Sequence, residues 1–326
     1  MSRPSTRAAR AAATVSEPPP FRDRFLIVDD FLPLDLAEAM RRRIDDHFAD
    51  PGAHRPPTHQ VWNYWFVPEL YTYLRTQPEK VIALDLMDRF QARLGAWADE
   101  TLGLSGVTWP YLSLYVAGCR QGLHNDAVNG RFGYVYSLTR NERRTSGGET
   151  IVHHEGDPFR TQLTRPGAGR SFYDAIPPRF NRLVIFDDRM PHAVERVDGS
   201  MDPREGRFVL HGHISEGEGA VTGALASADA MPRAIEALSD FVRTAPAPID
   251  AYHGPLTLRL EIQPDGSVAR VRVLMDRVIH PDERDPSWLP LTQALLARLG
   301  ALRFPAAAGP SRLTLPLLFG TPLPER

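Results

Sequence analysis

The chain contains a single cysteine, Cys119, among its 326 residues. No internal disulfide can form, so the fold must be stabilised by a packed core, and a reducing compartment such as the cytoplasm is indicated. The sequence also lacks an apolar run of the roughly 20 residues that a membrane-spanning helix needs. We therefore expect a cytoplasmic protein that has no membrane partner.

An excess of either charge is also missing, because 38 basic residues face 40 acidic ones and the formal net charge is −2. No nucleic-acid partner is expected, since such binding usually needs a broad basic surface. A phosphate-binding glycine loop and a serine-nucleophile motif are absent as well. Turn-forming residues are abundant instead, with 30 prolines and 24 glycines, which favours short strands over long helices.

The pattern of the sequence divides the chain into four parts. Residues 1–20 are rich in Arg, Ala and Ser, which predicts a disordered arm, with a targeting peptide as the alternative. Residues 21–217 are predicted to form one domain, in which helices precede a strand-rich core at 109–217. Residues 218–250 are predicted to be a linker with one helix. Residues 251–326 are predicted to form a small β-β-α-β module around a hairpin.

The fold class follows from this order of elements. Amphipathic helices are expected at Phe31–Phe48 and Pro78–Leu102, ahead of a series of short strands, one of them at Leu123–Val128. Strands at close spacing without helices between them are typical of a sandwich or barrel. The sequence therefore predicts a mainly β protein with flanking helices and a small α+β module at its C-terminal end.

Two short motifs suggest a metal site. The segment His124-Asn125-Asp126 is followed much later by Pro191-His192. Two histidines and one carboxylate match the ligand set of a mononuclear non-haem iron(II) site, which leaves other metal positions open for a co-substrate and O₂. Alternate residues of a strand face the same side, so His124 and Asp126 would point together at one metal. His192 would join them from another strand.

A single arginine in an apolar run is the candidate for binding an anion beside this metal. Arg207 begins the run Arg207-Phe208-Val209-Leu210, which predicts a strand. A guanidinium there suits a small dicarboxylate. Arg204 is an alternative, but it lies in a polar loop, whereas a strand holds its side chains more rigidly.

Residues from about Tyr111 to Gly217 resemble the double-stranded β-helix core, a jelly-roll or cupin-like fold, of the 2-oxoglutarate/Fe(II)-dependent dioxygenase superfamily. The likeness is strongest to its prolyl-4-hydroxylase-like branch. The segments that carry it are Tyr115-Val116-Ala117-Gly118, His124-Asn125-Asp126, Ser137-Leu138-Thr139, Gly147-Gly148-Glu149-Thr150, Leu183-Val184-Ile185-Phe186, Pro191-His192-Ala193-Val194 and Gly206-Arg207-Phe208-Val209-Leu210.

The resemblance implies roles for five residues. His124, Asp126 and His192 would bind Fe(II), Arg207 would pair with the distal carboxylate of 2-oxoglutarate, and Tyr115 would add a hydrogen bond. The chain departs from the family pattern in two ways. The interval from His192 to Arg207 is longer than usual, and prolyl hydroxylases often have lysine in place of this arginine.

The resemblance also implies a reaction, the decarboxylation of 2-oxoglutarate to succinate and CO₂ by O₂, with ascorbate as a further cofactor candidate. This step would be coupled to hydroxylation of an unactivated C–H bond, with a proline-like residue of a peptide or protein as substrate. One alternative is a tailoring hydroxylase or desaturase of a free amino acid or small metabolite. A more remote one is an inert barrel that serves as a binding scaffold.

Several further residues are candidates for contact with the substrate, because they follow the metal motif, belong to an aromatic segment or share the strand face of Arg207. They are Asn129, Arg131, Tyr134, Trp62, Trp65, His211 and His213. For each of them a packing or surface role is the alternative. A zinc site formed by His211 and His213 with His153 and His154 also remains open.

The C-terminal module, Gly254 to Gly320, weakly resembles the C-terminal domain of TonB-like energy-transducing proteins. The resemblance is carried by Asp265-Gly266-Ser267-Val268, Ala294-Leu295-Leu296, Arg303-Phe304-Pro305 and Leu315-Pro316-Leu317. A packing appendage is one expectation for this module. Docking of a protein partner, for example by strand addition to an exposed edge, is the other.

Overall fold

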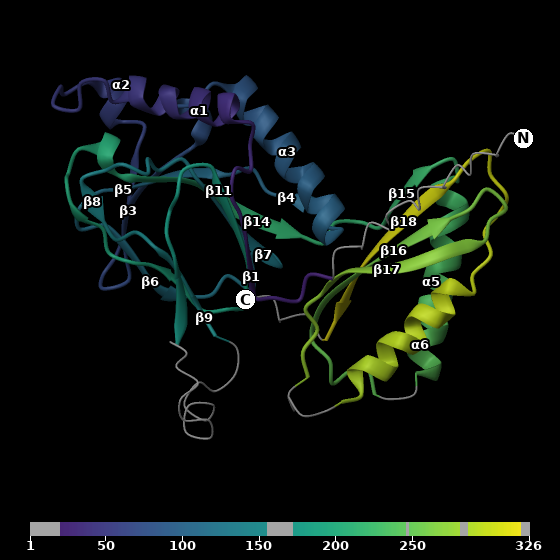
Figure 1. Ribbon diagram of the computed structural model, residues 1–326. Helices are drawn as coiled ribbons and strands as arrows, with labels where there is room; N and C mark the ends of the chain where they lie inside the picture. Colours follow the sequence, from purple (N-terminus) through teal and green to yellow (C-terminus); the bar gives the residue numbers. More distant parts are fainter. Residues whose placement is uncertain (1–19, 155–171, 246–247, 281–285, 321–326) are drawn as a thin grey trace, which may run out of the picture.

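The computed structural model describes residues 20–154, 172–245, 248–280 and 286–320, so the predicted N-terminal arm lies almost entirely outside the described residues. Two units lie side by side, and each has its own sheet and hydrophobic core (Figure 1). The first contains a curled sheet of 12 strands, and the second a sheet of four strands. The predicted mainly β fold with flanking helices and a smaller α+β part is confirmed.

The first unit contains most of the elements. In chain order they are β1 (Phe25–Val28), α1 (Leu34–His47), α2 (Pro56–His59), β2 (Asn63–Val67), β3 (Tyr71–Thr76), η1 (Pro78–Lys80), α3 (Leu84–Leu102), β4 (Gly106–Val107), β5 (Tyr111–Tyr115), β6 (Arg120–His124), β7 (Phe132–Ser137), β8 (Thr145–Ser146), β9 (Thr150–His153), β10 (Tyr173–Ile176), β11 (Arg182–Asp187), β12 (His192–Val194), β13 (Asp198–Gly199), η2 (Pro203–Glu205) and β14 (Arg207–Ser215).

The order of the strands in the large sheet brings distant parts of the sequence together. That order is β1-β11-β7-β14-β5-β3-β6-β12-β9-β10, with β2 paired to β3 and β4 to β14. The neighbours β6 and β12 are antiparallel, and their register places His192 opposite His124. On the other side of β12, Val194 lies opposite Thr150 of β9. The register therefore gathers the two predicted histidine ligands at one place.

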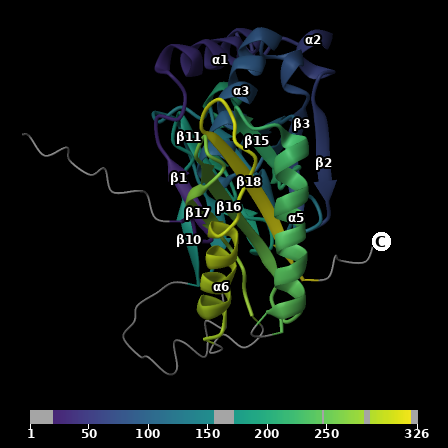
Figure 2. The same ribbon diagram turned by 90° about the vertical axis from the view of Figure 1, so that its right-hand side faces the viewer.

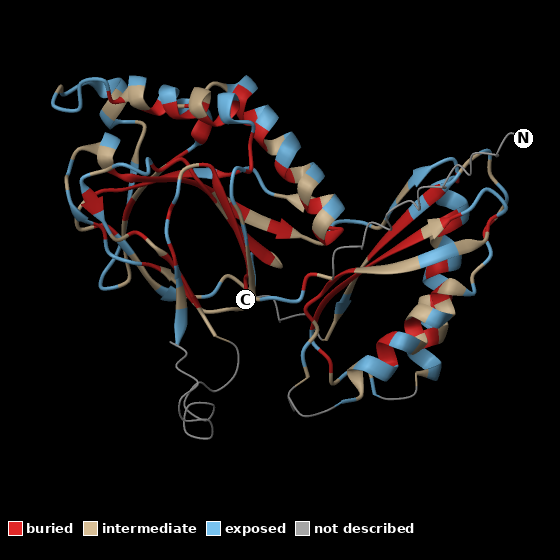
Figure 3. Ribbon diagram, viewed as in Figure 1, coloured by how far each residue is buried: buried red, intermediate tan, exposed pale blue. Residues whose placement is uncertain are grey.

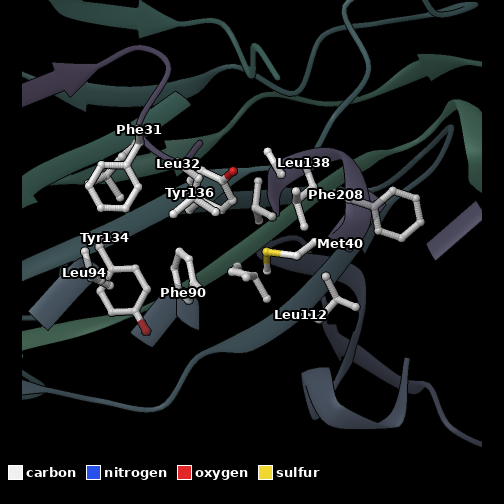
Figure 4. Packing of buried hydrophobic residues seen from close by; sticks show 14 of the residues in the cluster. Phe31, Leu32, Met40, Phe90, Leu94, Leu112, Tyr134, Tyr136, Leu138 and Phe208 are labelled. Atoms are coloured by element: carbon white, nitrogen blue, oxygen red, sulfur yellow. The ribbon is translucent and has the colours of Figure 1, made fainter. Parts of the chain in front are cut away.

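Helices α1 and α3 cover one face of this sheet with their apolar sides (Figure 1). In α1 the buried residues include Leu36, Met40 and Ile44, at the spacing that puts side chains on one face of a helix. Figure 4 shows Met40 and Phe90 of the helices packed among strand residues of the same core. The structure starts α3 at Leu84, and Pro78–Lys80 form a separate 3₁₀ turn in which proline takes the first position.

The second unit contains β15 (Ala220–Gly223), α5 (Ser227–Thr244), β16 (Gly254–Ile262), β17 (Val268–Asp276), α6 (Trp288–Gly300) and β18 (Ser311–Phe319). Its strand order is β15-β18-β16-β17, and both helices lie on the sheet face turned away from the first unit (Figures 1 and 2). This sheet thus includes β15, and its core includes residues of α5, so the unit has more elements than the β-β-α-β module predicted from residue 251.

Contacts between the two units involve buried residues (Figure 3). Met275 of β17 belongs to the core of the first unit, and Phe21 donates its backbone N–H to Leu274 at 2.9 Å. Arg259 of β16 donates hydrogen bonds to the backbone carbonyl of Asp99 and the carboxylate of Glu100, at the C-terminal end of α3.

Among the helices described, none is long and apolar enough to cross a bilayer.

Candidate metal centre

The first histidine motif lies at the end of a strand and not within one. Strand β6 ends at His124, so the prediction of a strand over Leu123–Val128 is wrong. The backbone N–H of Asp126 donates to the carbonyl of Asp188 at 2.9 Å, and the carbonyl of Asp126 accepts from Asn129 N–H at 2.8 Å. The backbone of Asp126 is therefore part of a turn. The side chain of Asp126 lies beside His124 because of this turn, and not because alternate residues of a strand face the same side.

The ligand atoms of His124, Asp126 and His192 all lie within 4.8 Å of one another. Oδ2 of Asp126 is 3.4 Å from Nε2 of His192 and 3.8 Å from Nε2 of His124. The two imidazole rings have centroids 4.3 Å apart. The structure therefore brings the three predicted ligands to one point.

Backbone carbonyls set the tautomers of both histidines. Nδ1 of His124 lies 2.8 Å from the carbonyl oxygen of Gly122, and Nδ1 of His192 lies 3.0 Å from that of Met190. A carbonyl only accepts a hydrogen bond, so each Nδ1 carries a hydrogen, and in the neutral ring Nε2 is then the nitrogen whose lone pair can bind a metal.

The carboxylate of Asp126 is held in its ionised form. Burial would raise its pKa, but the hydrogen bond and charge of His192, with His124 nearby, lower the pKa of Asp126 to about 2. Asn129 donates its side-chain N–H to Oδ1 of Asp126 at 3.0 Å. Metal binding requires both imidazoles to be deprotonated at Nε2, and two such imidazoles with one carboxylate are the donor set that suits non-haem iron(II), so these residues could hold that metal.

A zinc site that includes His153 and His154 finds no support. In residues 20–154, 172–245, 248–280 and 286–320, the clusters that could hold a metal are His124–Asp126–His192 and Asp126–Asp188–His213. Neither cluster contains His153 or His154. His154 instead lies 3.8 Å from the carboxylate of Asp174.

Arg207 lines the same cavity as the three candidate ligands and is almost completely buried. Its Nη2 donates to Thr150 Oγ1 at 3.2 Å, and its guanidinium carbon lies 4.8 Å from the ring centre of Tyr115. Nε and Nη1 are buried and have no hydrogen-bond partner in the described part of the chain. Unpaired buried donors are costly, so this site fits an anion such as a carboxylate of 2-oxoglutarate.

Arg204, the alternative to Arg207, lies elsewhere. It forms an ion pair with Asp202 at 3.1 Å and does not line the cavity. The η2 turn that carries Arg204 places its side chain at the surface, where Asp202 already neutralises its charge. Arg207 is therefore the arginine placed beside the candidate metal ligands.

Tyr115 connects the arginine to the metal side of the cavity. Its hydroxyl donates to Oε1 of Gln121 at 3.1 Å, and Nε2 of Gln121 lies 3.3 Å from Nε2 of His124. Gln121 and Thr150 line the cavity, and no site role was predicted for either residue from the sequence, although Thr150 belongs to one of the segments that carry the family resemblance. Their place depends on the pairing of β6, β12 and β9, and no local pattern records that pairing.

Three of the predicted substrate residues line the cavity, namely Tyr134, His211 and His213. The Tyr134 hydroxyl donates to the carbonyl of Thr108 at 2.8 Å. His211 Nε2 lies 2.8 Å from Ser113 Oγ, and burial lowers the pKa of His211 to about 3, so this imidazole is neutral at pH 7. His213 Nδ1 lies 3.0 Å from Oδ2 of the buried Asp188.

The other predicted substrate residues do not line it, and they are Asn129, Arg131, Trp62 and Trp65. Arg131 forms an ion pair with Glu216 at 2.9 Å. Trp62 packs against the core of the first unit and donates its indole N–H to His47 at 3.1 Å. Trp65 lies on β2 and is 38% exposed.

Comparisons with known proteins agree with this site. Residues 111–215 match the family model of the 2OG-Fe(II) oxygenase superfamily. The match does not extend to the second unit, so the TonB-like resemblance stays a prediction. No curated protein matches the sequence.

Several solved structures are similar to the chain. A prolyl hydroxylase from Trichoplax adhaerens, in complex with a hypoxia inducible factor peptide, has 15% identity and a TM-score of 0.43, over 59% of this chain and 84% of that chain. A prolyl-4-hydroxylase from Pseudomonas putida has 16% identity and a TM-score of 0.42, over 59% and 92%. An α-ketoglutarate-dependent epimerase of nogalamycin biosynthesis has 16% identity and a TM-score of 0.40, over 59% and 77%.

The matched residues 111–215 include His124, Asp126, His192 and Arg207. The cluster of ligand atoms and the buried arginine with unpartnered N–H groups lie within this same stretch. Residues 111–215 therefore form a domain of the 2OG-Fe(II) oxygenase superfamily, an enzyme domain that uses iron(II), 2-oxoglutarate and O₂.

Proposed function

We propose that this chain hydroxylates an unactivated C–H bond of a proline-like residue in a peptide or protein, coupled to conversion of 2-oxoglutarate to succinate and CO₂. The observation that carries the proposal is the cavity shared by His124, Asp126, His192 and Arg207. Two imidazole Nε2 atoms, a carboxylate and an unpaired guanidinium edge line it together.

In this proposal each group has a defined task. His124, Asp126 and His192 hold iron(II), and Arg207 binds the distal carboxylate of 2-oxoglutarate through its free N–H groups. When bound, the iron would supply the O₂-dependent oxidation of the C–H bond. Protein side chains alone do not perform this reaction. Thr150 orients the guanidinium of Arg207 through the hydrogen bond to Nη2.

The residues on the other side of the cavity would orient the substrate. His213 uses Nδ1 toward Asp188, which leaves Nε2 for a hydrogen bond to a polar group of the substrate. His211 is neutral, so it would contribute packing and hydrogen bonding and no charge. Tyr134 contributes its ring, because its hydroxyl is used by Thr108.

An exposed edge strand supports a peptide substrate. All residues of β2 are exposed, among them Tyr64, Trp65 and Phe66. This strand pairs with β3, and no strand in the described part of the chain pairs with its other edge. Tyr71 at the start of β3 packs its ring against His124, with centroids 5.3 Å apart. Val67 of β2 lies opposite Tyr71, so an extended peptide that paired with this end of β2 would be separated from the strand of Tyr71 by β2 alone.

The first experiment tests the iron site. The protein is reconstituted anaerobically with iron(II), and 2-oxoglutarate is added while the visible charge-transfer absorption is recorded. We expect a band that is lost in His192→Ala and that needs at least about tenfold more 2-oxoglutarate in Arg207→Ala. Arg204→Ala serves as the control and should leave the band unchanged. A native protein that binds no iron would contradict the proposal and favour the inert scaffold.

The second experiment tests the substrate class. Succinate formation is measured with proline-containing peptides and, separately, with free proline and other amino acids. Stimulation by peptides alone supports the proposal. Stimulation by free amino acids alone would instead indicate a tailoring enzyme that acts on small molecules.

A cytoplasmic location and protein docking through the second unit stay predictions.

A further inference from the structure

The turn that carries His192 joins two neighbouring parts of the site. Strand β11 ends at Asp187, and β12 begins at His192, so residues 187–192 form what we call the ligand turn. The backbone N–H of Met190 donates to the carbonyl of Asp187 at 2.9 Å, and the carbonyl of Asp188 accepts from Asp126 N–H at 2.9 Å. The position of this turn therefore affects both His192 and Asp126.

Two arginines surround the carboxylate at the start of the ligand turn. Asp187 is only 1% exposed. Arg189, within the turn, donates through Nε to Oδ1 of Asp187 at 2.9 Å and through Nη2 to Oδ2 at 2.6 Å. Arg277, which follows β17 of the second unit and is 4% exposed, donates through Nε to Oδ2 at 3.0 Å.

The second unit also binds Arg189 through its backbone. Nη2 of Arg189 donates to the carbonyl of Arg277 at 2.7 Å, and Nη1 donates to that of His253 at 3.3 Å. The close approach of Arg189 depends on Gly254, because a Cβ there would collide with Nη1 of Arg189 and with the carbonyl of Arg277. The backbone φ of Gly254 is 122°, a value that also favours glycine. Arg277 also donates through Nη1 to the carbonyl of Arg22 at 2.6 Å. Of these contacts, the hydrogen bond from Arg277 to Asp187 is buried, whereas those of Arg189 are partly exposed.

We propose that the second unit positions the iron site: Arg277 and the carbonyls of His253 and Arg277 clamp Asp187 and Arg189, and so fix the ligand turn that presents His192. The inference rests on the proposed iron-binding function. Arg277 is a positioning residue, since it touches no candidate ligand itself. A buried charge network of this kind holds a single geometry, and loss of one partner leaves the others uncompensated.

The same interface provides a matched control at Arg259. This arginine is also buried, at 3% exposed, and it also crosses from the second unit to the first. It donates to the carbonyl of Asp99 at 2.8 Å and to Glu100 at 3.0 Å. These partners lie on α3, which carries no candidate ligand. A general stabilising effect of the interface should appear in variants of both arginines, whereas positioning should appear only in those of Arg277.

The test compares Arg277→Gln, Arg277→Lys and Arg259→Gln in the full chain. Cobalt(II) affinity is measured as a stand-in for iron(II), with His192→Ala to identify the site, and backbone hydrogen exchange is followed in the metal-free protein. We expect Arg277→Gln to weaken cobalt binding about tenfold, as loss of an outer-shell contact does, and to speed exchange in residues 187–192. Arg277→Lys should recover part of the affinity, and Arg259→Gln should stay within about twofold of the native value.

Each other outcome is decisive. Native-like cobalt affinity in both Arg277 variants would overturn the inference while leaving the proposed function intact. Equal weakening in Arg277→Gln and Arg259→Gln would also overturn it, because the effect would then be general stability. If Arg277→Gln does not fold, Arg277→Lys decides by the same criteria. A native protein that binds no cobalt at the His192 site would remove the proposed function, and the inference with it.

Discussion

Arg207 places a charge inside the first unit, and its Nε and Nη1 have no hydrogen-bond partner in the described part of the chain, although the charge of Glu149 acts on it. Burying a charge without a hydrogen-bonded partner costs several kcal/mol, and binding of an anion beside Arg207 would offset this cost. Thr150 and the ring of Tyr115 contact only part of the guanidinium. In the proposed function, the free N–H groups of Arg207 bind the carboxylate of 2-oxoglutarate.

Replacing Arg207 by lysine tests this assignment at the scale of one residue. Lysine keeps the charge but loses the planar pair of N–H donors, so we expect the Michaelis constant for 2-oxoglutarate to rise about tenfold. Iron affinity should stay unchanged, because Arg207 contacts no candidate ligand. Arg204→Lys is the control and should match the native enzyme. An unaltered Michaelis constant in Arg207→Lys would mean that the co-substrate binds elsewhere.

At this scale the sequence indicated some site residues and not others. His124, Asp126 and His192 could be found because their types and order are typical of an iron(II) site. Gln121 and Asp188 could not, because a glutamine in a strand and an aspartate before a turn have many ordinary roles. Gln121 contacts His124 within β6, and Asp188, in the turn after β11, contacts His213 of β14, and the meeting of these groups at one site exists only in the folded chain.

At the scale of elements, length decided what could be predicted. Helices α1, α3 and α5 are long enough for the spacing of their apolar residues to be recognised. Strand β15 has four residues and lies in the part that was predicted as a linker, because so short and exposed a strand shows no clear alternation of apolar residues. The extent of β6 was wrong for a related reason, since the hydrogen bonds that form the turn at Asp126 come from distant backbone.

The end of α3 yields a stability prediction. Gly103 caps this helix at φ 67°, and an added Cβ would meet Thr257 and Leu274 of the second unit. We expect Gly103→Ala to lower the free energy of unfolding by about 2–4 kcal/mol, from left-handed strain and overpacking together. Gly95→Ala in the same helix meets nothing within 4 Å and should raise it by about 0.5–1 kcal/mol. Urea unfolding of both variants measures the difference, and equal effects would contradict the close contact at Gly103.

For the whole molecule, the contact between the units was the least predictable feature. Arg277 and Asp187 are 90 residues apart in the sequence, and each looks like an ordinary surface charge when seen alone. Arg259 likewise lies in an alternating strand and meets α3 only after both units have folded. Charge pairing at such distances depends on the packing of two finished sheets, which no local pattern encodes.

The ion pair between Asp187 of the first unit and Arg277 of the second makes the free energy of unfolding depend on pH. Burial would raise the pKa of Asp187, but the hydrogen bonds and charges of Arg189 and Arg277 hold this pKa below its ordinary value. The folded state therefore favours the ionised carboxylate. The contribution of this ionised carboxylate to the free energy of unfolding is fully present above the pKa that Asp187 has in the unfolded chain, about 4. It is lost as the pH falls through the lower pKa that Asp187 has in the folded protein.

We therefore expect the urea midpoint of the native protein to fall as the solution is acidified below about pH 4. Asp187→Asn should be less stable at pH 7, because the arginines lose their counter-charge, but its midpoint should change less on acidification. Asp29→Asn is the control, because its partner Arg182 also lowers the pKa of Asp29 but this carboxylate is half exposed, where solvent weakens the effect. An equal acid response in the native protein and Asp187→Asn would assign the acid sensitivity to other carboxylates, and the ion pair between the units would then contribute little to their association.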